Sequence, residues 1–206
     1  MTKQYIFPIV EGHGEVAAVP PLIRRWIAHV GRLDEYGVHE PIRAPGAAAL
    51  KCAFNAERKL GVEYFVGLAR RRAPAGILIL LDADSSCTAS ASEPPLGPTL
   101  LSRAKAVAAD TQIAVVVADP EYEAWFLAYA ATVFPGVATA PVTPRRDCKA
   151  QVRSLLGTPY REPVEQLLLT KRLPLPPVDE IPTINNRSYR KLCKELARLI
   201  PPTPPL

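Results

Sequence analysis

The chain has 206 residues, of which 48% are hydrophobic and 22% charged, a composition typical of one globular domain with a sizeable core. No apolar segment approaches the ~18 residues of a membrane span, and the N-terminus lacks the features of a signal peptide. The four cysteines are widely dispersed, which argues against a disulfide framework or a zinc knuckle. We therefore expect a cytoplasmic protein with reduced thiols and no contact with a membrane.

Predicted strands and helices alternate over the first two thirds of the sequence. The strands are expected at 4–10, 36–44, 76–81 and 112–118, and the helices at 17–30, 47–72, 99–109 and 121–133. We expect an interruption of the second helix near Gly61. This alternation predicts an α/β fold with a central, mainly parallel sheet of about four strands flanked by helices. Pro8 cannot donate a backbone hydrogen bond, so a central position for the first strand requires a local irregularity.

The composition changes in the last third of the chain. Residues 1–140 carry 13 basic and 14 acidic side chains, whereas residues 141–206 carry 12 and 6, so the net charge of +5 comes from the C-terminal part. That part also holds 12 of the 23 prolines, which separate predicted helices at 145–156, 163–171 and 187–200. We expect an α/β domain over 1–140 and, packed on it, a helical, basic, proline-rich part over 141–206.

Carboxylates follow three of the predicted strands. Glu11 and Glu15 follow the first, Asp82 and Asp84 the third, and the fourth is followed by the segment DPEYE (119–123). The carboxyl ends of parallel strands meet at one edge of a sheet, so these groups should converge. Clustered carboxylates repel one another unless a cation lies between them, and oxygen ligands favour Mg²⁺ or Mn²⁺. Any one of them can instead be a helix cap or turn residue; the coincidence over three strands favours a metal site.

Two of these segments resemble the Toprim fold, which is shared by topoisomerases, primases and the OLD (overcoming lysogenization defect) nucleases. They are IVEGHGE (9–15) and LLDADSS (80–86). The further segments VADPEYEAWFLA (117–128) and NRSYRKLCKEL (186–196) resemble an uncharacterised bacterial Toprim-like family related to the OLD nucleases. Ser86 stands where topoisomerases and primases carry a third aspartate, so the resemblance favours the nuclease branch.

The resemblance implies both a site and an activity. It implies that Glu11, Asp82 and Asp84 are catalytic, and that Mg²⁺ or Mn²⁺ is held by the same three residues together with Glu15 and Glu123. The activity it implies is that of a metal-dependent nuclease acting on phosphodiester bonds of DNA or RNA. It further implies an ABC-type ATPase as partner in a phage-defence system. The alternative is a non-enzymatic regulatory or binding subunit of such an ATPase. A haloacid-dehalogenase-type phosphotransferase is disfavoured, because its DxD motif belongs on the first strand.

Basic side chains are the candidates for binding nucleic-acid phosphates. Those predicted to do so are Arg43, Arg187, Arg190, Lys191 and Lys194, with Lys149 and Arg153 as further candidates. The four from Arg187 onward recur at helical spacing and form one stripe. The alternative for such a stripe is a solvated helix face without a ligand.

Overall fold

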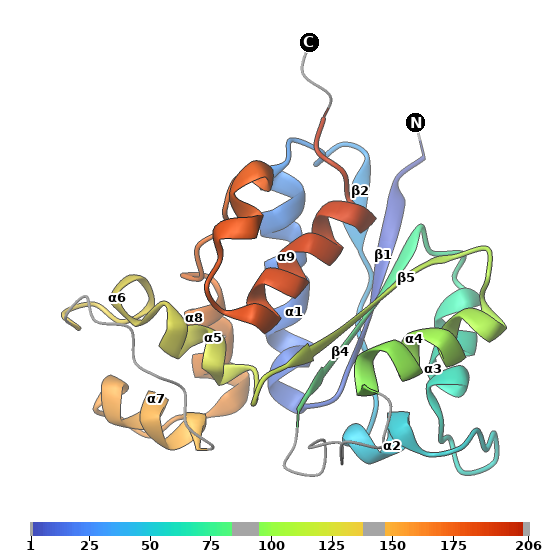
Figure 1. The fold of residues 1–206 in the computed structure, drawn as a ribbon, viewed down its shortest axis with the longest axis horizontal. Coiled ribbons are helices and arrows are strands. Elements are labelled where there is room, and N and C mark those ends of the chain that lie inside the picture. Colours follow the sequence, from blue (N-terminus) through green and yellow to red (C-terminus); the bar gives the residue numbers. More distant parts are fainter. Residues whose placement is uncertain (1, 84–94, 138–146, 204–206) are drawn as a thin grey trace.

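The computed structural model describes residues 2–83, 95–137 and 147–203. Its centre is a sheet of five strands, in which every described pair is parallel (Figure 1). The strands are β1 (Gln4–Val10), β2 (Tyr36–Val38), β3 (Ile42–Arg43), β4 (Gly76–Asp82) and β5 (Gln112–Ala118). Their order is β2-β1-β4-β5, and β3 also pairs with β1. The predicted α/β class with a mainly parallel sheet is confirmed, with five strands in place of about four.

The additional strand arises because the predicted strand 36–44 is divided in two. β2 pairs with residues 4–6 of β1, and β3 pairs with residues 9–10. Pro8 lies between these two paired stretches and faces Leu78 of β4 on its other side. Because Pro8 has no N–H to donate, the edge partner of β1 is interrupted near it, and the irregularity expected at this position is the break between β2 and β3.

Helices cover both faces of the sheet. The helices α1 (His13–His29) and α9 (Arg187–Leu199) lie on one face, and α3 (Val62–Arg70) and α4 (Leu96–Val107) lie on the other (Figure 1). Side chains of β4 alternate between two buried clusters: Leu78 and Leu80 join the first, whereas Ile77, Ile79 and Leu81 join the second. This period of two explains the continuously apolar sequence of the strand, because both of its faces are buried.

Two predicted helices are shorter than expected. The stretch 47–72 gives α2 (Ala47–Lys51) and α3, separated by a non-helical segment that ends at Gly61. Gly61 caps α3 with a φ of +91°, a conformation that favours glycine. The stretch 121–133 gives α5 (Glu123–Ala128) and α6 (Ala130–Val133), because Tyr129 leaves the helical region of φ and ψ. None of the described helices has both the length and the apolar composition required to cross a membrane.

The C-terminal third packs against the same core as the first two thirds. It contains α7 (Cys148–Leu156), a π-helical turn η2 (Glu162–Gln166), α8 (Leu167–Thr170), a 3-10 helix η3 (Val178–Thr183) and α9. Apolar side chains of α7, α8 and α9 join those of α1 and α5 in one buried cluster. The elements η2 and α8 contact α1, and α7 contacts α5. The basic part of the chain therefore approaches the carboxyl end of the sheet.

The direction of α9 is fixed by hydrogen bonds at both of its ends. Ser188 Oγ accepts from the Asp119 N–H (3.2 Å) and from Trp125 Nε1 (2.8 Å), beyond the carboxyl end of β5. Arg198 Nη2 donates to the carbonyl of Ile113, near the other end of β5 (2.5 Å). Therefore α9 runs antiparallel to β5, and its first residues lie at the carboxyl edge of the sheet.

Candidate metal centre

The adjacent strands β1 and β4 bring Glu11 and Asp82 to the same edge of the sheet. In the parallel register Val10 lies opposite Leu80, so both chains leave the sheet at nearly the same level. Glu11 Oε2 accepts a hydrogen bond from the Asp82 N–H (3.1 Å). This contact places one carboxylate beside the backbone that carries the other.

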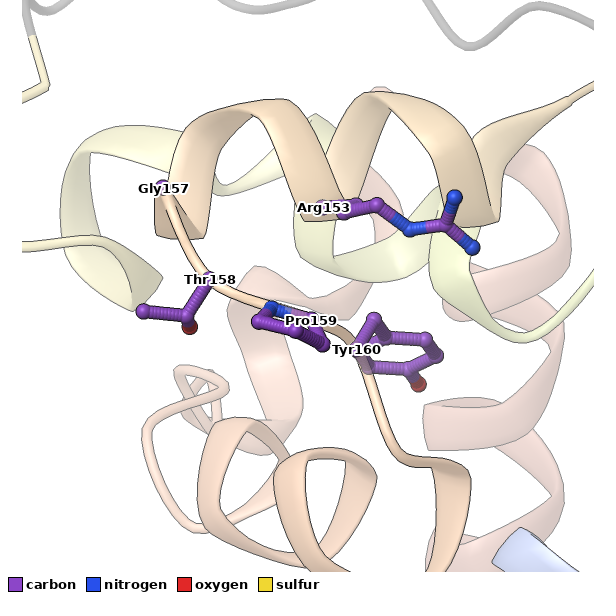
Figure 2. Close-up of a pocket in the computed structure, with 5 residues that line it drawn as sticks. All are labelled: Arg153, Gly157, Thr158, Pro159 and Tyr160. Atoms are coloured by element: carbon purple, nitrogen blue, oxygen red, sulfur yellow. The ribbon is translucent and has the colours of Figure 1, made fainter.

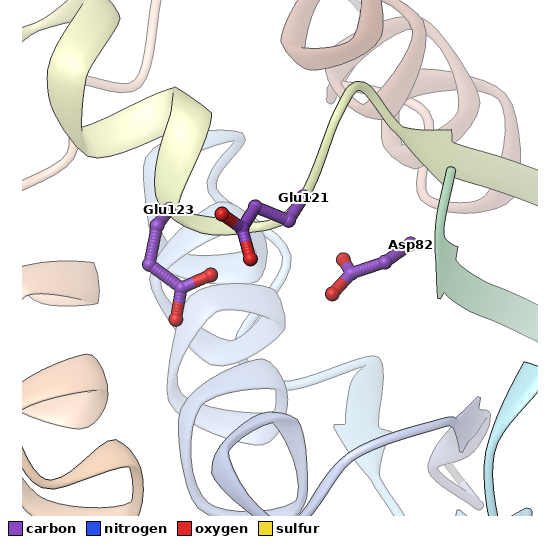
Figure 3. A group of neighbouring side chains, drawn as sticks. All are labelled: Asp82, Glu121 and Glu123. Atoms are coloured by element: carbon purple, nitrogen blue, oxygen red, sulfur yellow. The ribbon is translucent and has the colours of Figure 1, made fainter. Parts of the chain in front are cut away.

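The connection after β5 adds two further carboxylates to this edge. Asp82 Oδ1 accepts from the Tyr122 N–H (2.9 Å), and the fully buried Tyr122 ring anchors the connection through its hydroxyl, which lies 3.1 Å from Thr170 Oγ1. Glu121 and Glu123 flank Tyr122. Within the described ranges, Asp82, Glu121 and Glu123 each offer a carboxylate oxygen within 4.8 Å of the others. Figure 3 shows the three side chains directed toward one another.

Each glutamate of this trio accepts a hydrogen bond from the C-terminal third. Glu121 Oε1 accepts from the Cys148 N–H at the start of α7 (2.7 Å). Glu123 Oε1 accepts from the Tyr160 hydroxyl (2.7 Å). Each contact holds one oxygen of its own glutamate. The rotation of each carboxylate is therefore restricted before any ligand binds.

The second oxygen of Glu123 has no such partner. Glu123 is 1% exposed, and its Oε2 is buried without a hydrogen-bond partner among the described residues. Burial raises the pKa of Glu123 to about 7. Burial, reinforced by the charges of Glu15, Glu123 and Glu11, raises the pKa of Asp82 to about 9. A buried, unpartnered carboxylate oxygen among other carboxylates is the environment that a bound cation would stabilise.

Glu15 lies beside the trio, in the first turn of α1. It is buried, and its Oε1 accepts from Gln166 Nε2 (2.9 Å). Two glycines make room for this arrangement. A Cβ atom on Gly14 would lie 1.5 Å from Gln166 Oε1, and one on Gly12 would lie 2.1 Å from Glu15 Oε2. The glycines of the GHG sequence thus allow Glu15 and Gln166 to pack against the start of α1.

Lys149 is the cation that faces the trio from α7. Its Nζ lies 2.6 Å from Glu162 Oε1, and its charge interacts with Glu123 and Glu121. Burial acts to lower the pKa of Lys149, but the hydrogen bond to Glu162 and the neighbouring carboxylates raise it overall. Lys149 therefore remains protonated and is a positive charge beside the clustered carboxyl groups.

The structure places most of the predicted acidic residues at one edge. Glu11 and Glu15 lie beside Asp82, and Glu123 belongs to the trio, whereas Asp84 lies outside the described residues. Glu121 was not among the predicted ligands, although the PEYE sequence placed it two residues from Glu123. Glu121 lies in the connection before α5, which begins at Glu123.

The contribution of the C-terminal third was also missed by the sequence analysis. Tyr160 and Gln166 hold Glu123 and Glu15 by side-chain hydrogen bonds. They precede and end the π-helical turn η2, a type of turn that often occurs at functional sites. No motif marked them, because they lie far along the chain from the residues that they contact.

Two of the predicted nucleic-acid contacts lie at the edge that carries the carboxylates. Arg43 is the last residue of β3, is exposed, and pairs in register with Val10, next to Glu11. Arg187 is exposed at the start of α9, and that end of the helix lies beyond the carboxyl end of β5. Their placement at this edge is compatible with contacts to a ligand of the acidic site.

The rest of the predicted basic stripe runs along α9 away from this edge. Arg190 donates to the carbonyl of Ile184 (3.0 Å), and Lys191 pairs with Glu195 (2.5 Å). Lys194 is exposed one turn further along. The stripe therefore combines intramolecular contacts with exposed charge, and only its first residue lies close to the acidic site.

The donor set of the trio consists of carboxylates, which fit a hard divalent cation. The site combines three converging carboxyl groups with a buried oxygen that has no hydrogen-bond partner in the part of the chain that the structure describes. A search for similar proteins finds no matching family model, no matching curated protein and no matching solved structure.

Proposed function

We propose that this protein is a divalent-metal-dependent nuclease that hydrolyses phosphodiester bonds of DNA or RNA. The observation that carries the proposal is the convergence of Asp82, Glu121 and Glu123 around the buried, unpartnered Oε2 of Glu123. The Toprim-like segments and the positive charge of the C-terminal third support a phosphate ester as the substrate.

In this proposal the trio holds Mg²⁺ or Mn²⁺. When bound, such an ion activates water and offsets the charge that develops on the phosphate. Hydrolysis joins the oxygen of a water molecule to phosphorus and breaks one ester P–O bond. Glu11, half-buried at the rim beside Asp82, takes the proton of the attacking water, and the leaving oxygen gains a proton from solvent. The charge of Lys149 opposes part of the effect of burial on the pKa of Glu123 without occupying the centre.

The residues around the trio restrict its geometry. Tyr160 orients Glu123, the Cys148 N–H orients Glu121, and the Tyr122 N–H orients Asp82. Such outer contacts tune metal affinity by ~10–100-fold in known metal sites. The same proposal includes an ABC-type ATPase as partner, which is supported by the OLD-like resemblance.

The test combines metal binding with cleavage. Calorimetric titration with Mn²⁺ and cleavage of labelled single- and double-stranded DNA and RNA are measured for the wild type, Asp82→Asn and Glu57→Gln. Glu57 is an exposed glutamate outside the site and provides the control. We expect the wild type and Glu57→Gln to bind Mn²⁺ and to cut nucleic acid, and Asp82→Asn to remain folded while losing cleavage by more than ~100-fold.

The same measurements can also refute the proposal. If the wild type neither binds Mn²⁺ nor cuts any of the four substrates, the nuclease proposal is wrong. The non-enzymatic role as a binding subunit of an ATPase then takes its place.

A further inference from the structure

A hollow of about 410 Å³ lies on the basic C-terminal third, where α7 ends. It is lined by Arg153, Gly157, Thr158, Pro159 and Tyr160 (Figure 2). Gly157 has a φ of +66° and turns the chain back after the helix. Arg153 and the segment 157–159 are exposed, so the hollow is open to solvent. Its volume falls within the ~300–1,000 Å³ of small-ligand sites.

The hollow adjoins the candidate metal centre through the side chain of Tyr160. Tyr160 lines the hollow, while its hydroxyl donates to Glu123 Oε1 at 2.7 Å. The helix α7 gives a second connection, because its first residue, Cys148, donates its N–H to Glu121. Tyr160 therefore links the hollow to Glu123 of the trio.

The helix carries a row of positive charge in the same direction. Lys149 and Arg153 are four residues apart, which places them on one face of α7, about 6 Å apart along its axis. Lys149 interacts with the carboxylates of the trio, and Arg153 lies one turn further out, at the hollow. This separation is comparable with that of neighbouring phosphates in a nucleic-acid strand.

Within the described part of the chain, the Arg153 guanidinium differs from those of Arg161 and Arg172 in having no partner. Arg161 pairs with Glu165, and Arg172 donates to the carbonyl of Val133. The Arg153 side chain forms no ion pair or hydrogen bond with any residue in the described ranges 2–83, 95–137 and 147–203. A guanidinium binds phosphate oxygens well, and an aromatic ring such as that of Tyr160 packs against the base or sugar of a nucleotide.

We propose that this hollow is a nucleotide subsite that takes the nucleotide next to the scissile phosphodiester. Arg153 binds the phosphate of that nucleotide, and the ring of Tyr160 packs against its base or sugar. The inference rests on the proposed function, because it assigns the scissile phosphate to the trio. A base reaches the Tyr160 ring only when it is unpaired, so the subsite selects single-stranded nucleic acid over a duplex.

The test measures binding without cleavage. Fluorescence anisotropy with a labelled single-stranded 12-residue DNA and its duplex is recorded in the Asp82→Asn background, with Arg153→Gln or Arg161→Gln added. Arg161 is the matched control, an exposed arginine of the same segment that lies outside the hollow. We expect Arg153→Gln to weaken single-strand binding about tenfold and to lower the salt dependence by about 0.7 in log–log slope. Arg161→Gln should change neither quantity, and the duplex should bind more weakly than the single strand.

The subsite and the nuclease proposal fail in different ways. If the wild type binds Mn²⁺ and cuts DNA or RNA but Arg153→Gln binds the single strand as Arg161→Gln does, the subsite is wrong and the proposed function stands. If the wild type shows no Mn²⁺ binding and no cleavage but Arg153→Gln still weakens single-strand binding selectively, the hollow binds a nucleotide that the trio does not cleave, and the nuclease proposal is wrong.

Discussion

Replacing Glu123 by Gln should stabilise the metal-free protein at alkaline pH. The side chain is buried, and one of its oxygens has no hydrogen-bond partner among the described residues. The amide has nearly the same shape, and its Oε1 can still accept from Tyr160. The substitution therefore removes the buried charge and keeps the described contact.

The magnitude follows from the proton affinity of Glu123. Its pKa rises from 4.5 to about 7 on folding, chiefly by burial, and each tenfold change in proton affinity corresponds to ~1.36 kcal/mol. Because the folded state binds the proton more tightly, wild-type stability falls as pH rises between these two values and is level above about 7. The penalty removed by Gln is therefore about 3 kcal/mol at pH 8 and about 1 kcal/mol at pH 5.

The assay is urea unfolding in EDTA at both pH values. The control is Glu57→Gln, an exposed substitution expected to change the unfolding free energy by less than ~0.5 kcal/mol. In parallel, Mn²⁺ should raise the thermal midpoint of the wild type but not that of Glu123→Gln. A variant no more stable than the wild type at pH 8, or an equal gain at pH 5, would refute the assignment of a buried charge to Glu123.

Two substitutions test the surroundings of the site. Gly14→Ala places a methyl group against Gln166 Oε1, so the Gln166 contact to Glu15 should break and the unfolding free energy in urea should fall by about 1–3 kcal/mol. An unchanged or raised stability, as expected for alanine at an ordinary helical position, would contradict the close approach. Ser188→Ala leaves the Asp119 N–H and the buried Trp125 Nε1 without their acceptor, and should lower the unfolding free energy by about 2–4 kcal/mol and alter Trp125 fluorescence. Retained stability with unaltered fluorescence would show that α9 is not held through Ser188.

The sequence by itself determined the strands whose side chains are mostly buried on both faces of the sheet. The strands 4–10 and 112–118 were predicted with the bounds found in the structure, because continuous apolar runs require burial on both faces. The alternation of strands and helices indicated a parallel sheet, and therefore that Glu11 and Asp82 follow their strands at the same edge. In the structure the Asp82 N–H donates a hydrogen bond to Glu11 at that edge. Both inferences depend on periodicity and chain direction, which are local properties of the sequence.

Only the tertiary structure decided which carboxylates converge and what surrounds them. The direction of Glu121 depends on the conformation of the connection before α5, which Asp82 and Thr170 fix through Tyr122. Tyr160 reaches Glu123 across 37 residues and Gln166 reaches Glu15 across 151, and no local pattern encodes contacts between segments so far apart. The sequence places polar groups at the ends of strands and helices. Packing of the C-terminal third against α1 and α5 determines which of these groups become buried and which receive a hydrogen bond.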